Sequence, residues 1–73
     1  MDWERVAKHW VYFKVRARQR WGRISPDELD VIGGRRDRLT ECIRELYGIS
    51  QGAAEMQVES WQGRLEEPGT AAA

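Results

Sequence analysis

The side chains best suited to covalent or acid–base chemistry are one histidine (His9), one cysteine (Cys42) and two serines that precede apolar runs (Ser25 and Ser50). A hydrolytic or metal centre needs several such groups to converge in one cleft. His9 has no second histidine to share a metal with, and both serines stand where helix N-caps are typical. We therefore expect no catalytic residue, no metal site and no cofactor, and we expect that the protein is not an enzyme.

Two further features could carry chemistry but have simpler structural interpretations. The acidic cluster Asp27, Glu28 and Asp30 follows Ser25-Pro26, and two acids in a first helical turn suit the positive end of the helix dipole. Cys42 falls on the apolar face of a predicted helix, where we expect a small buried hydrophobe. A redox-sensing thiol is the alternative, and it would need exposure and a lowered pKa.

Charge is unevenly distributed, although twelve Lys and Arg balance twelve Asp and Glu. Residues 1–24 carry a net charge of +5, against −2 for residues 25–50 and −3 for residues 51–73. Cations interleaved with an aromatic ring could contact phosphates and stack on bases. We favour a solvated helix face, with a nucleic-acid contact as the alternative. The residues of this basic face, opposite the tryptophans of the first predicted helix, are Arg5, Lys8, Tyr12, Arg16 and Arg20.

Val11 and Val15 lie one helical turn apart and to one side of the predicted core stripe. They could widen the contact of the first helix with another helix, which is the interpretation we favour because four packed helices leave little of a central helix uncovered. The alternative is an exposed patch for self-association. In that case two copies would meet through Val11, Tyr12 and Val15, and the protein would be a homodimer rather than the monomer that we expect.

Glycines and capping residues divide the chain into four predicted helices and a tail. Ser25-Pro26-Asp27-Glu28 has the order of a capping box, and Gly48 stands where a left-handed helix end is typical. The pair Gly33-Gly34 before two arginines predicts a plain helix connection, with a phosphate-binding turn as the alternative. The predicted helices cover residues 3–21, 26–32, 35–47 and 51–65. We expect one domain at residues 1–65 and a disordered tail at residues 66–73.

Apolar residues recur at helical spacing in every predicted helix. The first helix has a stripe with three tryptophans (Trp3, Trp10 and Trp21), and the fourth adds Trp61. The fold class we expect is therefore all-α, a small four-helix bundle built from two short helical hairpins. The remaining core positions that we expect are Val6, Ala7, Phe13, Lys14 through its aliphatic stem, Ala17, Leu29, Ile32, Leu39, Cys42, Ile43, Leu46, Ala54, Val58 and Leu65.

The order and spacing of these anchors resemble the CsbD-like family of small bacterial general stress-response proteins. The resemblance covers about residues 3–65 and implies two roughly orthogonal hairpins, no catalytic residues and a stress-linked role of undefined biochemistry. The chain departs from the usual family pattern at Val11, Tyr12 and Val15. The matching residues are Trp10, Phe13, Lys14, Ala17, Trp21-Gly22, Leu29, Ile32, Gly34, Leu39, Tyr47-Gly48-Ile49-Ser50, Ala54, Gln57-Val58 and Trp61.

Composition and charge restrict the partners. Hydrophobic residues make up 41% and charged residues 33%, as in globular proteins, and we find neither a membrane-spanning run nor a secretion signal. We expect a cytoplasmic binding module with a protein partner or none, no membrane partner, and nucleic acid as the less favoured alternative.

Overall fold

Residues 2–65 are described by a computed structural model, and all regular elements among them are helices. The all-α prediction is confirmed, but the structure has five helices where we expected four. The predicted tail at 66–73 lies outside the described residues. The helices are α1 (Trp3–Lys8), α2 (Trp10–Arg20), α3 (Pro26–Ile32), α4 (Arg36–Tyr47) and α5 (Gln51–Arg64).

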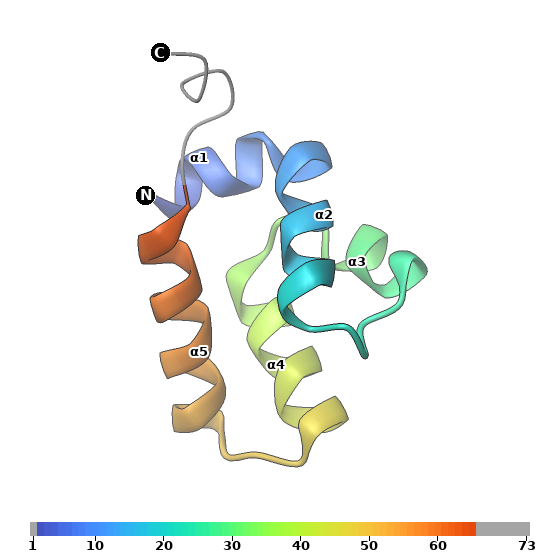
Figure 1. Ribbon diagram of the computed structural model, residues 1–73, viewed down its shortest axis with the longest axis vertical. Coiled ribbons are helices and arrows are strands. Elements are labelled where there is room, and N and C mark those ends of the chain that lie inside the picture. Colours follow the sequence, from blue (N-terminus) through green and yellow to red (C-terminus); the bar gives the residue numbers. More distant parts are fainter. Residues whose placement is uncertain (1, 66–73) are drawn as a thin grey trace.

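The extra helix arises because the first predicted helix is interrupted at His9. This residue leaves helical geometry, with φ −109° and ψ 35°, so that α1 and α2 run in different directions (Figure 1). The prediction of one helix over 3–21 is wrong for a tertiary reason. The change of direction brings the indole N–H of Trp3 within 2.9 Å of the carbonyl oxygen of Gly34.

The predicted starts of α3 and α5 and the predicted end of α4 are confirmed by their caps. Ser25 and Glu28 form the capping box at the start of α3, and the Ser50 hydroxyl accepts a hydrogen bond from Ala53 N–H at the start of α5. Gly48 ends α4 with φ 62°, a conformation that favours glycine. Asp2 precedes α1 but makes no side-chain cap bond.

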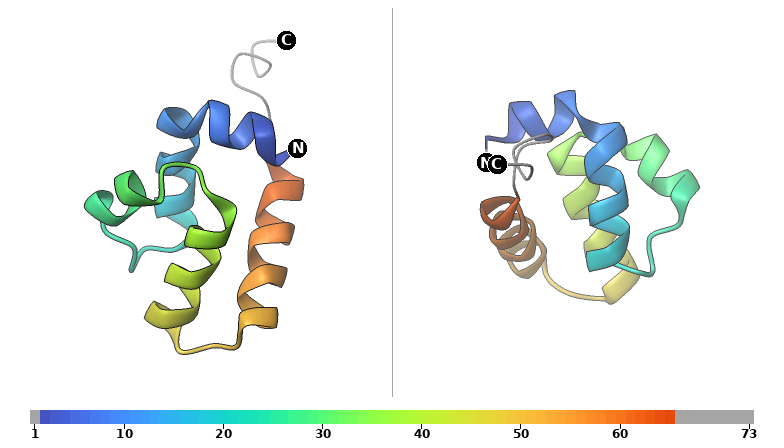
Figure 2. Two further views of the ribbon diagram at one scale, coloured as in Figure 1. Left: turned by 180° about the vertical axis from the view of Figure 1, so that it is seen from behind. Right: turned by 45° about the horizontal axis from the view of Figure 1, so that its top comes forward.

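The helices α4 and α5 lie side by side and antiparallel, joined by a short loop (Figure 1). α1 crosses one end of this pair, and α3 lies on the side of the molecule away from α5 in all views (Figure 2). α2 packs against α3, and α3 against α4. The predicted bundle of two roughly orthogonal hairpins is not confirmed. α4 and α5 form one hairpin, but α1, α2 and α3 are three helices and do not form a second one.

Tryptophans join the helices at the core through both ring packing and hydrogen bonds. The Trp61 ring packs at 6.2 Å from Trp3 and 5.3 Å from Trp21, between ring centroids. Trp10 donates its indole N–H to the Leu29 carbonyl oxygen at 2.9 Å. Each of these contacts joins two elements, so the tryptophans position the helices as well as excluding water.

Most predicted core residues are buried, with two informative differences. Ile24, in the connection between α2 and α3, is fully buried although the helical pattern did not include it. Lys14 is only half-buried, and its ammonium forms a 2.7 Å ion pair with Asp30. The buried core consists of Val6, Trp10, Phe13, Ala17, Trp21, Ile24, Leu29, Ile32, Leu39, Ile43, Ala54, Val58 and Trp61.

Candidate binding surface

The outward side of α2 exposes aliphatic side chains that no other described element covers. Because Trp10, Phe13 and Ala17 face the core, residues opposite them at i, i+4 and i+7 face solvent. Val11 is 79% exposed and Val15 56% exposed. We call this surface, made of Val11, Tyr12, Val15, Arg18 and Gln19, the α2 outer face.

The exposure of Val11 and Val15 contradicts the interpretation that we favoured from the sequence. They do not widen a helix contact, because α3 packs beside α2 and not over these valines, leaving both more than half exposed. The structure therefore has the exposed patch of the alternative interpretation, with Tyr12 at 40% exposure beside it.

The residues of the predicted basic face are brought together only in part. The interruption at His9 leaves Arg5 and Lys8 on α1, whereas Tyr12, Arg16 and Arg20 lie on α2. Two of the arginines are held by neighbouring rings. Arg16 donates to the Tyr12 hydroxyl at 3.1 Å with its guanidinium 5.6 Å from the ring centroid, and Arg20 lies 5.2 Å from the centroid of Trp21.

A groove of about 250 Å³ continues the α2 outer face toward α3. The buried side chain of Leu29 contributes to it, together with Pro26 at the start of α3. The Lys14–Asp30 ion pair also lines it, so the charge of Lys14 is already compensated. On α2 the groove is lined by Lys14, Val15, Arg18 and Gln19.

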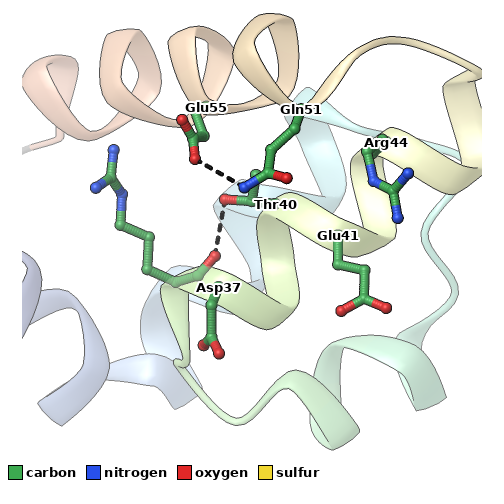
Figure 3. Close-up of a pocket in the computed structure, with 7 residues that line it drawn as sticks. Asp37, Thr40, Glu41, Arg44, Gln51 and Glu55 are labelled. Atoms are coloured by element: carbon green, nitrogen blue, oxygen red, sulfur yellow. Dashed lines mark hydrogen bonds between the residues drawn. The ribbon is translucent and has the colours of Figure 1, made fainter.

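A second groove, of about 530 Å³, lies between α4 and α5 and is lined by side chains of both charges (Figure 3). Two hydrogen bonds join residues that line it. The buried Thr40 hydroxyl donates to the Arg36 carbonyl oxygen at 2.9 Å, and Gln51 donates to Glu55 at 3.2 Å. The hydroxyl is thus committed to a helical back-bond rather than aimed into the groove as a nucleophile.

The lone cysteine is poorly suited to redox chemistry. Cys42 is half-buried, and its thiol donates to the Glu28 carboxylate at 3.5 Å. Burial, then the hydrogen bond and negative charge of Glu28, raise the pKa of the Cys42 thiol to about 11. A thiol that resists ionisation at neutral pH is a weak nucleophile, which opposes the redox-sensing alternative.

The described residues form neither a metal site nor a membrane-spanning helix, and the double-glycine turn has a structural role. Within residues 2–65, no three His, Cys, Asp or Glu side chains come together as a metal site. Over the same part of the chain, every helix lacks the combination of length and apolar character that crossing a bilayer requires. Gly34 is buried and its carbonyl oxygen accepts the Trp3 indole N–H, so the double-glycine turn is a packing contact.

Sequence reasoning missed part of the α2 outer face. It named Val11, Tyr12 and Val15 but neither Arg18 nor Gln19. The spacing of Arg18 from Val11 and Val15, at i+7 and i+3, would have indicated a shared face. The adjoining groove, to which Pro26 and Leu29 contribute, had no such signal, because it depends on how α3 packs against α2.

The chain is similar to small bacterial proteins over most of its length. It is 39% identical over 62 residues to a UPF0337 protein of Pectobacterium atrosepticum, covering 85% of this chain and 90% of the relative. It is 41% identical over 61 residues to a UPF0337 protein of Rhodopseudomonas palustris, covering 84% and 92%. The UPF0337 protein YjbJ of Escherichia coli K12 is 33% identical over 66 residues, covering 90% and 96%. No family model and no solved structure matches the chain.

Proposed function

The chain belongs to the UPF0337 family, and we propose that it is a non-enzymatic, CsbD-like protein that acts by binding another protein through the α2 outer face. The observation that carries this proposal is the exposure of Val11 and Val15, 79% and 56%, on adjacent turns of one helix. Exposed aliphatic side chains gain free energy when a partner removes them from water, about 0.8 kcal/mol for each buried methylene.

The non-enzymatic part of the proposal is supported by the engagement of the candidate nucleophiles. Ser25 and Ser50 accept hydrogen bonds from backbone N–H groups as helix caps. Thr40 donates to a helical carbonyl oxygen, and the pKa of Cys42 is raised to about 11. Each side chain therefore has a structural partner in place of a catalytic base.

We also propose that the protein is cytoplasmic and that it takes part in the general stress response. The resemblance of the core and turn residues to the CsbD-like family supports the stress link, and the free thiol of Cys42 is compatible with a reducing compartment. Quantifying the protein in fractions of growing and stressed cells tests both parts. We expect a rise under stress, in the cytoplasmic fraction, and a constant level or a different fraction would contradict them.

The binding role is tested by comparing proteins that co-purify with three tagged forms of the chain in its own host. These are the original sequence, the double variant Val11→Ser with Val15→Ser, and the control Met56→Ser. Met56 is 71% exposed on α5, so its replacement removes exposed apolar surface on another helix. We expect at least one protein to be retained by the control and lost from the double variant. Identical sets from all three forms would contradict the proposal.

A further inference from the structure

The α2 outer face combines an aliphatic centre, Val11 and Val15, with one cation of its own, Arg18, and with a second, Arg16, at its edge. Residues 10–20 contain Lys14, Arg16, Arg18 and Arg20 and no acidic residue. The exposed valines are on the same helix, and the adjoining groove toward α3 adds the apolar surface of Leu29 and Pro26. A partner must match both properties, so the charge identifies the kind of partner where apolar area alone would not.

A second copy of the chain matches this surface poorly. Two α2 helices packed through Val11 and Val15 would bring Arg16 and Arg18 of one copy near the same arginines of the other, with no acid on either helix. Like charges that face each other across an interface oppose association.

Nucleic acid also matches the α2 outer face poorly. Val11 and Val15 at the centre of the surface have no group that could hydrogen-bond to a phosphate or a base edge. Tyr12 is the aromatic ring that could stack on a base, and the Arg16 guanidinium lies over it at 5.6 Å while the Phe13 ring packs against it at 4.9 Å. A base would have to displace these contacts.

A helix of another protein fits the shape of the surface. α2 has eleven residues, about 16 Å of helix, and its exposed side meets the groove that α2 and α3 line together. The cation that the groove leaves uncompensated is Arg18, because Lys14 is paired with Asp30 at 2.7 Å. A docked helix with apolar residues on one side and acidic residues on its flank would cover the valines and pair with Arg18.

We propose that the α2 outer face and its groove bind an acidic amphipathic helix of a partner protein. This inference rests on the proposed function and names the class of partner. Apolar side chains one turn apart on the partner cover Val11 and Val15, and a third enters the groove beside Leu29. Its carboxylates contact Arg18 and, at the edge of the face, Arg16.

The test is an NMR titration of the full chain with two synthetic peptides of about 18 residues. Both peptides have leucines at helical spacing on one side. One has glutamates on its flanks, and the other has lysines at the same positions. We expect the glutamate peptide to shift the amide signals of Val11, Val15, Arg18 and Leu29, and to bind at least about tenfold more tightly than the lysine peptide.

Variants of the chain assign this binding to the surface. Val15→Ser and Arg18→Glu should each weaken the glutamate peptide about tenfold or more, because the first removes apolar contact and the second reverses the charge. Met56→Ser, on α5, should leave the affinity unchanged. Equal binding of both peptides, shifts centred on α4 and α5, binding of neither peptide, or displacement by duplex DNA would overturn the inference.

Failure of this inference is distinguishable from failure of the proposed function. If co-purification depends on Val11 and Val15 but the glutamate peptide does not bind, the α2 outer face has a partner that is not an acidic helix. If co-purification is also independent of these valines, both proposals are wrong.

Discussion

A side-chain carbon built on Gly34 would lie 2.9 Å from the Cα atom of Ala7, closer than real Cβ atoms approach another carbon. The two residues are far apart in sequence, and their contact fixes α1 against the connection between α3 and α4. Gly34 also has φ +82°, which side chains rarely adopt. Its carbonyl oxygen accepts the Trp3 indole N–H at 2.9 Å, so one glycine anchors α1 by backbone contact and by hydrogen bond.

Gly34→Ala should therefore destabilise the fold by at least about 2 kcal/mol, through backbone strain and overpacking against Ala7. Gly22→Ala is the matched control, because a side-chain carbon there meets nothing within 4 Å. Its effect should stay within about 0.5 kcal/mol. Urea unfolding followed by circular dichroism measures both, and equal losses in the two variants would show that the Gly34–Ala7 contact contributes nothing specific.

The capping box gives a second prediction, on pH. A hydrogen bond from the Ser25 backbone N–H, and then one with the Ser25 side chain, lowers the pKa of Glu28 below its ordinary value of 4.5. A carboxyl whose pKa is lower in the folded state stabilises the fold above its unfolded-state pKa, and this contribution is lost as the pH falls through the folded-state pKa.

Glu28→Gln should accordingly be less stable than the original chain at pH 7, and the difference should shrink as the pH falls below 4.5. Parallel urea titrations of the two proteins at several pH values give the difference directly. A difference that stayed constant from pH 7 to the acid end would mean that ionisation of Glu28 does not stabilise the cap.

Cys42 should react slowly with alkylating reagents at neutral pH. Its pKa is raised from 9.0 to about 11, so the thiolate fraction at a given pH is about 100-fold smaller than for an ordinary thiol. The rate of iodoacetamide labelling should keep rising beyond pH 9 in the folded protein. Unfolded protein in guanidinium serves as the control and should level off near pH 9, and a folded-state plateau at the same pH would contradict the assignment.

Nucleic-acid binding by the basic face should be absent. The overall charge is zero, Arg5 and Lys8 lie on a different helix from Arg16 and Arg20, and the Tyr12 ring is occupied by Arg16. We expect no change in the anisotropy of labelled single- or double-stranded DNA even at low salt. Binding that weakened steeply with salt and disappeared when Arg5, Arg16 and Arg20 were replaced by glutamine would reverse this conclusion.

The sequence predicted those parts of the fold that local signals determine. Ser25, Glu28, Gly48 and Ser50 specify helix ends through contacts with residues a few positions away, and helical spacing identified most of the core. The interruption at His9 has no glycine or proline to indicate it. It follows from distant contacts, chiefly those of Gly34 with Trp3 and Ala7.

The candidate surface was also predictable only in part, because it too depends on contacts between residues far apart in the sequence. Exposure of Val11 and Val15 depends on where α3 packs relative to α2, which the helical pattern of α2 does not contain. Ile24 illustrates the converse, because it is fully buried although it lies in the connection between α2 and α3. Patterns within one helix identify faces, and the packing of other helices decides which faces are covered.

The measurement that tests the central claim most directly is photocrosslinking in living cells with a photoreactive phenylalanine derivative at position 15 or, as control, position 56. Val15 and Met56 are both exposed, at 56% and 71%, but lie on α2 and α5. If the α2 outer face binds a protein, position 15 should give a discrete crosslinked product that position 56 does not. No product at position 15, or the same products at both positions, would contradict the claim.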